Sequence, residues 1–429
     1  MKNINHFDAE ELISKGIISR ETAEAIQAYY SQKENSPNNR LYIAFGILGS
    51  LLVGLGIILM LAHNWDQLSR LTKTIIAFLP LLLPQMLVWF TLTKKRESVA
   101  WSESSAVLLT LGIGTTISLV SQIYHIPGDI DSFLLTWILL SLPLIYLLSS
   151  SAASLLSIIG ITLYTMLTSD GKLSAEDPLI YIALMSATIP HYLMCIKNKS
   201  TSNFTSFHHW FYAISPLFVL GFFIESSSSK IAFGYLSLFA ILISIASFKF
   251  FESRSFWSNG YSIIGSLGLV VIMTIFGFEY MWNNEYQIPY SYATFVSNTS
   301  AITAGVITFF AALLAGNHLR IAGIRNARPE LIAFILFLPV YFFGMSFPGF
   351  AQIMTNFLIL GLGVYIAYRG AKQNHLGFMN YGLLITVLLA ICRFFDDELS
   401  FVLRGSLFVA VGVGFFVSNY LLIRKMKQA

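Results

Sequence analysis

Long apolar runs alternate with short polar segments along almost the whole chain, a pattern that predicts membrane-spanning helices. A helix needs about 20 mostly apolar residues to cross the hydrocarbon core of a bilayer. Fourteen segments fit this length, at residues 41–62, 71–92, 101–123, 132–149, 152–168, 178–196, 210–224, 231–249, 261–280, 299–318, 331–345, 353–368, 376–392 and 401–423. The sequence therefore predicts an all-α fold, a polytopic membrane bundle of about fourteen transmembrane helices over residues 41–429.

Composition supports a membrane protein. Hydrophobic residues make up 55% of the 429 positions and charged residues only 11%, whereas about a quarter of the residues in soluble domains are charged. This balance excludes a soluble multidomain enzyme, a secreted disulfide scaffold, a disordered chain and a nucleic-acid binder. Membrane lipids are the expected surroundings, and no nucleic-acid partner is expected.

The distribution of basic residues predicts the orientation. Lys and Arg concentrate in cytoplasmic segments next to span ends. With the N-terminus inside, 20 of the 26 Lys and Arg residues fall in inner segments and 6 in outer ones. We therefore expect both termini in the cytoplasm. The tryptophans support the same boundaries, since Trp65, Trp137 and Trp282 fall near the predicted outer interface, where indoles are enriched.

Residues 1–40 precede the first span and predict a small cytoplasmic helical hairpin and linker. Gly16 suits the C-terminal cap of a first helix. Ser19 can cap the next helix, and Glu21 is favoured in its first turn. No apolar core of a secretory signal peptide is present in this segment. Two interpretations stay open: a hairpin packed on the cytoplasmic face, or a docking module for a protein partner.

The first candidate site is the polar segment 63–70 between the first two predicted spans. Asp66 and Arg70 are four residues apart, a spacing that pairs charges on one helix. One hypothesis is that His63 or Asp66 serves as a proton carrier or ligand on the outer face. The alternative is a short interfacial helix anchored by Trp65.

The second candidate site lies at the end of the third predicted span. Ser118, Gln122 and His125 follow one another at helical spacing and share a face if the helix continues. Asp129 follows after a Pro-Gly turn. Polar residues at membrane depth usually face the bundle interior or a wet cavity. The hypotheses are an outward-facing substrate or proton site, or hydrogen bonding between helices.

The third candidate site joins the last two predicted spans. Arg393 and Arg404 lie on the predicted outer side, against the usual bias of basic residues, and Asp396 is an available ion-pair partner. Guanidinium groups bind phosphate or carboxylate through two parallel hydrogen bonds. Arg393 and Arg404 are therefore the best candidates for an anionic ligand, with a structural ion-pair cluster as the alternative.

Other features favour structural roles. Gly-x-Gly pairs, such as Gly112 with Gly114, suit close helix packing. His191 is expected to hydrogen-bond to a neighbouring helix, and Cys195 and Cys392 to pack without pairing. The chain lacks the phosphate-binding G-x-x-x-x-G-K-[ST], the zinc-binding H-E-x-x-H and C-x-x-C, and the nucleophile motif G-x-S-x-G. No catalytic residue, metal or cofactor is predicted.

Three stretches together resemble a known group of proteins: the 63–70 segment, Gly128-Asp129 before an apolar helix pair, and the C-terminal Arg393-Phe394-Phe395-Asp396 with Arg404-Gly405. They resemble bacterial predicted multi-pass membrane proteins of a domain-of-unknown-function family, number twenty-one fifty-seven, which begin with a helical hairpin. Residues 5–150 resemble that domain, and 358–419 the C-terminal region often found with it. The resemblance implies a bacterial inner (cytoplasmic) membrane protein and implies no activity.

The favoured hypothesis is a nucleotide-independent transporter or lipid flippase. Its outward-side polar site would comprise His125, Asp129, Arg393, Asp396 and Arg404, with His63, Asp66, Arg70 and Gln122 as secondary candidates. The first alternative is a non-catalytic envelope scaffold or regulator that acts through partner proteins. The second is an intramembrane transferase on a lipid-linked substrate. An enzyme is the less favoured class.

Overall fold

The computed structural model is all-helical over the part of the chain that it describes. It describes residues 15–16, 19–22, 52, 65–168, 177–198, 200, 202–224, 228–252, 259–283, 299–394, 402, 405–406, 409, 412–413 and 416, and none of these lies in a strand. The chain divides into two compact units, Met1–Ile76 and Ala77–Ala429. The predicted spans 41–62 and 401–423 lie outside the continuously described ranges.

One short 3-10 helix and fourteen α-helices make up the described structure. They are η1 (Trp65–Gln67), α4 (Arg70–Lys94), α5 (Val99–Tyr124), α6 (Ile130–Leu147), α7 (Ser151–Thr168), α8 (Asp177–Asn198), α9 (Asn203–Phe223), α10 (Ser228–Ala246), α11 (Lys249–Glu252), α12 (Gly260–Phe276), α13 (Tyr280–Asn283), α15 (Thr299–Ala322), α16 (Pro329–Gly344), α17 (Pro348–Lys372) and α18 (Leu376–Phe394).

Each of the twelve predicted spans from 71–92 to 376–392 coincides with one of the long helices. Eight of the described helices are long and apolar enough to cross a membrane by length and composition, and three more are apolar but shorter. An all-α membrane protein with several apolar helices is thus confirmed, while the total of fourteen spans and the orientation stay predictions.

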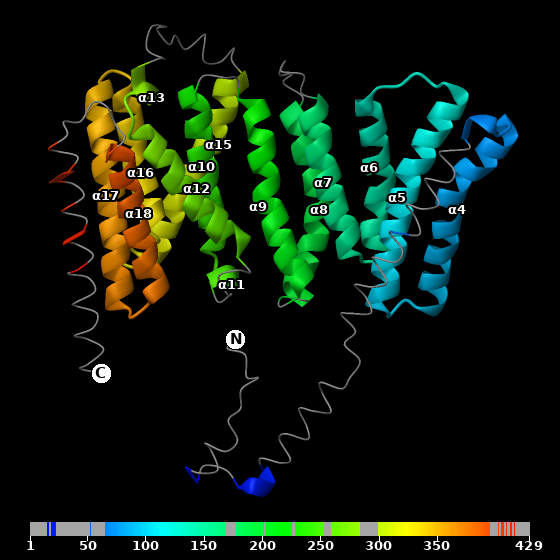
Figure 1. Cartoon of the computed structure of the whole chain (residues 1–429), viewed down its shortest axis with the longest axis horizontal. Coiled ribbons are helices and arrows are strands. Elements are labelled where there is room, and N and C mark those ends of the chain that lie inside the picture. The colour runs from blue at the N-terminus through cyan, green and yellow to red at the C-terminus, as the bar shows by residue number, and fades with distance from the viewer. Residues whose placement is uncertain are drawn as a thin grey trace. The chain divides into compact units, whose positions relative to one another are not determined.

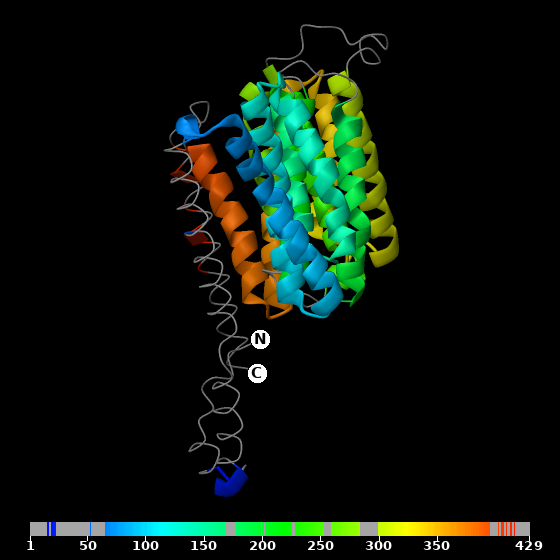
Figure 2. The ribbon, with the colours of Figure 1, turned by 90° about the vertical axis from the view of Figure 1, so that its right-hand side faces the viewer.

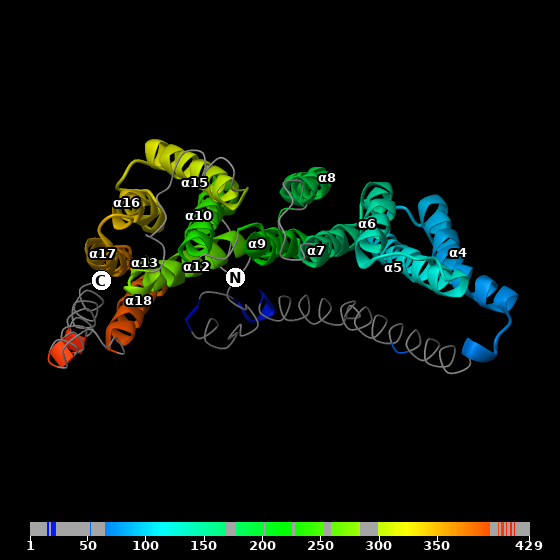
Figure 3. The same ribbon diagram turned by 90° about the horizontal axis from the view of Figure 1, so that it is seen from above.

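The long helices of the second unit run side by side, and successive helices point in opposite directions (Figures 1 and 2). Figure 3 shows the same helices end-on. We call the end where α4 meets α5 the Lys94 end and the end where α5 meets α6 the His125 end. The N-termini of α7, α9, α12 and α16 lie at the Lys94 end (Figure 1).

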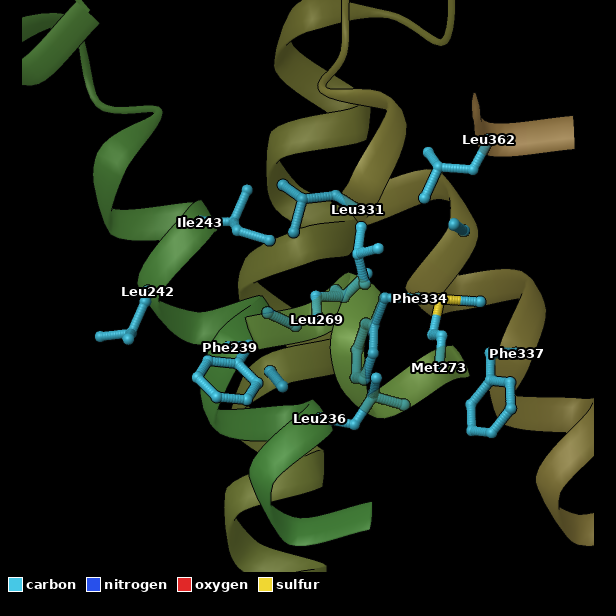
Figure 4. Packing of buried hydrophobic residues seen from close by; sticks show 14 of the residues in the cluster. Leu236, Phe239, Leu242, Ile243, Leu269, Met273, Leu331, Phe334, Phe337 and Leu362 are labelled. Carbon is cyan, nitrogen blue, oxygen red and sulfur yellow. The ribbon is translucent and has the colours of Figure 1, made fainter. Parts of the chain in front are cut away.

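The largest buried apolar cluster belongs to α10, α12, α16 and α17 (Figure 4). Leu236 and Ile243 of α10 pack with Leu269 of α12 and with Leu331 and Phe334 of α16, and all five are fully buried. By contrast, many apolar side chains on the outer faces of the helices are exposed, which is the pattern expected for helices surrounded by lipid.

Glycine permits the closest helix contacts, as the Gly-x-Gly pattern predicts. A Cβ on Gly112 of α5 would lie 1.9 Å from the carbonyl oxygen of Pro80 on α4. Pro84 has no N–H to bond that carbonyl within its own helix. On α18, a Cβ at Gly382 would lie 2.3 Å from the backbone nitrogen of Ala367 on α17. Side chains at these two positions would push the helices apart.

Two expectations about the first unit can be compared with the structure. Gly16 has φ +67°, and Ser19 Oγ accepts a hydrogen bond from the Thr22 N–H at 3.1 Å, so the predicted cap of a helix in the N-terminal segment is confirmed. The segment from Asp66 to Arg70 is not one continuous helix, because η1 ends at Gln67 and α4 begins only at Arg70; the pairing of the two side chains stays a prediction, since that of Asp66 lies outside the described residues. The remainder of the predicted hairpin lies outside the described residues.

Trp282 also departs from its predicted position at an interface with lipid headgroups. Its side chain is fully buried, and the indole N–H donates to the carbonyl of Phe276 at 2.7 Å. Trp282 packs against Phe276 and lies beside Gly344, where a Cβ would approach the indole ring within 2.1 Å. The indole therefore fills the core between α12 and α16.

Candidate functional site

A groove of about 820 Å³ lies between α4, α5 and α6 toward the His125 end. Its polar lining residues are Thr116, Ser118, Ser121, Gln122, Asp129, Ser132 and Thr136. Its apolar lining residues include Phe78 of α4 and Phe133 of α6. A volume of this size accommodates a drug-sized molecule or part of a lipid. The combination of polar and apolar lining residues suits an amphipathic ligand.

Hydrogen bonds fix the α4 side of the groove. Thr116 Oγ1 donates to the carbonyl of Ala77 at 3.0 Å, and the Thr116 side chain is buried. The indole N–H of Trp137 on α6 donates to the carbonyl of Thr110 on α5 at 2.6 Å. These two bonds join α5 to α4 and to α6, the three helices that line the groove.

His125 lies in the turn that ends α5. Its φ of 50° is left-handed, and the Ile126 N–H bonds the Ser121 carbonyl at 3.0 Å, a helix-ending turn usually built with glycine. The helix thus ends at Tyr124, and the predicted shared face of Ser118, Gln122 and His125 stops before His125. Gln122 lines the groove, whereas the exposed His125 is not among its lining residues.

Asp129 lines the groove and caps α6. Its carboxylate accepts a hydrogen bond from the Ser132 N–H at 3.0 Å. The Ser132 side chain and its backbone N–H lower the pKa of Asp129 below its ordinary value of 3.8. Asp129 is therefore ionised at neutral pH, and among the lining residues that the structure describes it is the only charged side chain.

Of the other predicted site residues, Arg393 and Arg70 are described by the structure, and neither lines this groove. Arg393 is buried at the end of α18, with its guanidinium carbon 4.1 Å from the centroid of the Phe278 ring. Helix α18 packs against α17 and α12. Arg70, the first residue of α4, is exposed. His63, Asp396, Arg404 and the side chain of Asp66 lie outside the described residues.

A second polar cluster, at the Lys94 end, was not predicted as a site. It contains three buried histidines, His191, His208 and His209, each at most 3% exposed. The rings of His191 and His208 lie 5.9 Å apart between centroids, and Tyr192 stacks on His208 at 5.8 Å. His191 does contact a neighbouring helix, as expected, through Ser151 of α7 at 3.4 Å. We name these three histidines the histidine cluster.

Glu103 of α5 connects the histidine cluster to the start of α7. Its carboxylate accepts hydrogen bonds from the Ser150 hydroxyl at 2.5 Å and from the N–H groups of Ser151 and Ala152 at 2.9 and 2.8 Å. One helix thereby caps the N-terminus of another. The adjacent pair His208-His209 inside an apolar segment was the sequence signal that could have identified this cluster.

Comparison with known proteins supports a membrane protein. Residues 10–154 match the family model described as Predicted membrane protein (DUF2157). No curated protein and no solved structure matches the chain. The similarity of the C-terminal region, 358–419, stays a prediction. Over residues 10–154 the resemblance is confirmed, and this stretch of the multi-pass membrane protein includes every residue that lines the groove.

Proposed function

We propose that the protein is a nucleotide-independent transporter or flippase for an amphipathic, lipid-like substrate. One observation carries this proposal: the groove between α4, α5 and α6 is lined by both polar and apolar side chains and lies beside helices suited to a membrane. In this proposal an acyl chain packs on Phe78 and Phe133, while a headgroup bonds to the hydroxyls and to Gln122.

The charge of the groove favours particular headgroups. Asp129 supplies one negative charge, and the described lining residues include no Lys or Arg. A phosphate-rich anionic headgroup would find no cation there, whereas amine-bearing or uncharged hydroxylated headgroups find acceptors and donors. We therefore expect the substrate to be zwitterionic with an amine, or a glycolipid, and not a strongly anionic lipid.

Lipid movement in proteoliposomes tests the proposal. The full chain is reconstituted with trace lipids that carry a fluorescent acyl-chain label on a glycolipid, a phosphatidylethanolamine or an anionic lipid, and dithionite quenching reports movement between leaflets. We expect wild type to move the first two faster than the anionic lipid. A Ser118→Phe variant fills the groove and should reduce the rate at least about tenfold, by excluding the substrate.

Thr115→Phe is the matched control. Thr115 is exposed on the same helix but does not line the groove, so the same aromatic addition should leave the rate unchanged. Wild-type rates equal to those of protein-free vesicles would overturn the proposal and favour the scaffold hypothesis. Equal rates in the Ser118→Phe and wild-type proteins would show that any transport bypasses the groove.

A further inference from the structure

The hydrogen bonds of His208 show which of its nitrogens can take up a proton. Nδ1 lies 2.7 Å from the carbonyl oxygen of Phe204, which can only accept, so Nδ1 carries a hydrogen. Nε2 lies 3.0 Å from the hydroxyl of Ser154. That hydroxyl donates to a neutral imidazole and, after rotation, accepts from an imidazolium. Both protonation states of His208 are therefore satisfied without movement of a helix.

The other two histidines have partners of the same kind. His191 Nε2 lies 3.4 Å from both Ser151 Oγ and Cys195 Sγ, and His209 Nδ1 lies 2.6 Å from the Tyr192 hydroxyl. Hydroxyl and thiol groups can each reverse their direction of donation. A purely structural contact does not require a partner that can reverse its direction of donation. Partners of this kind lie beside all three buried rings of the histidine cluster.

One carboxylate, that of Glu103, can balance the positive charge of a protonated histidine in the histidine cluster. The titratable side chains that face the histidine cluster from its neighbouring helices are Glu103 of α5, Tyr146 of α6, Tyr192 and Cys195 of α8, Tyr212 of α9 and Tyr261 of α12. Within the described part of the chain, Glu103 is the only carboxylate in this set. Three hydrogen bonds, two of them from N–H groups at the N-terminus of α7, hold this side chain in place.

We propose that His208, with His191 beside it and Glu103 as counter-charge, forms a buried proton-binding site at the Lys94 end. The site is separate from the groove, whose lining residues include none of these three, and it goes beyond the proposed function. Imidazole and carboxylate groups buried among membrane helices commonly bind or relay protons. The bound proton resides on Nε2 of His208 and is hydrogen-bonded to Ser154.

Nitrogen-15 magic-angle-spinning NMR of the full chain tests this site directly. The protein is labelled on histidine, reconstituted in liposomes and titrated from pH 5 to 9. We expect one buried imidazole signal to change from the neutral to the imidazolium position, and to be missing in His208→Gln. The signal of the exposed His375 is identified by the His375→Gln variant and serves as the reference for a histidine outside the cluster.

Substitution of the counter-charge separates a proton site from a structural histidine. Glu103→Gln should move the midpoint of the His208 titration down by about one pH unit, because the imidazolium loses its nearby negative charge. Glu97→Gln is the matched control in the exposed α4–α5 loop and should move it by less than about 0.3 unit.

These measurements test the proton-binding site independently of the proposed lipid transport. A His208 signal that stays neutral down to pH 5, or a midpoint unaffected by Glu103→Gln, would overturn it. If His208→Gln fails to fold, Ser154→Ala replaces it: the hydroxyl bonds the imidazolium more strongly than the neutral ring, so its loss should also lower the midpoint. An unchanged midpoint in Ser154→Ala would equally contradict the assignment.

Discussion

The cap that Glu103 places on α7 leads to a quantitative prediction about stability. Glu103→Ala removes the acceptor of three hydrogen bonds, two of them from backbone N–H groups at the first turn of α7. Hydrogen bonds to a charged acceptor contribute about 1.5–3 kcal/mol each. Glu103 is only half-buried, so water can form some of the hydrogen bonds that the substitution removes. We expect a net decrease of about 2–3 kcal/mol in the free energy of unfolding.

Thermal melting in detergent, followed by intrinsic tryptophan fluorescence, measures this effect. The expected drop in the melting temperature of Glu103→Ala is about 4–12 °C, at about 2–4 °C per kcal/mol. Glu103→Gln keeps one oxygen acceptor and should lose about half as much. Glu97→Ala in the neighbouring loop controls for the loss of a surface charge. On the scale of about 2–4 °C per kcal/mol, a difference of about 1 °C corresponds to less than about 0.5 kcal/mol. If Glu103→Ala melts within about 1 °C of Glu97→Ala, the cap therefore contributes little and the reasoning fails.

Three further predictions concern single positions. His125→Gly should leave the melting temperature unchanged or raise it, since glycine favours the left-handed conformation by about 0.5–1 kcal/mol; a clear decrease would reveal a stabilising role for the imidazole. Gly382→Ala should lower the melting temperature by several degrees, about 2 kcal/mol of overpacking, whereas Gly361→Ala, with no atom near the added Cβ, should not; equal effects would contradict the close contact of α17 with α18. Asp129, whose pKa is lowered on folding, stabilises the protein above its unfolded pKa and loses this contribution as the pH falls through its folded pKa. The difference in melting temperature between wild type and Asp129→Asn should therefore be constant above about pH 5 and shrink below about pH 4. A difference that grows in acid would refute the capping role.

The positions of the helices could be predicted because one physical requirement dominates. A bilayer requires long apolar segments, so the twelve central spans could be identified from length and apolarity alone, including the pair α6 and α7 that only residues 148–150 separate. The N-terminal cap at Ser19 was predictable for a similar reason, since a hydroxyl before a helix satisfies a local N–H group. These signals need no knowledge of distant contacts.

The candidate site was only partly predictable, because it depends on which helices become neighbours. Gln122 and Asp129 follow each other closely along the chain, and both line the groove. The prediction extended the helix through His125, since a histidine gives no sign that it will adopt a left-handed turn. The capping of α7 by Glu103 joins residues almost fifty positions apart, a contact that no local pattern indicates.

The connection between Glu103 and α7 has a consequence for the order in which the protein assembles. In synthesis from the N-terminus, α5 enters the bilayer before Ser151 and Ala152 emerge. The free N–H groups of the new helix then meet a carboxylate already in position, at a depth where unsatisfied backbone groups are costly. Biogenesis of the α6–α7 hairpin is thereby linked to a correctly inserted α5, and a chain in which α5 has slipped along its axis would stall with α7 undocked.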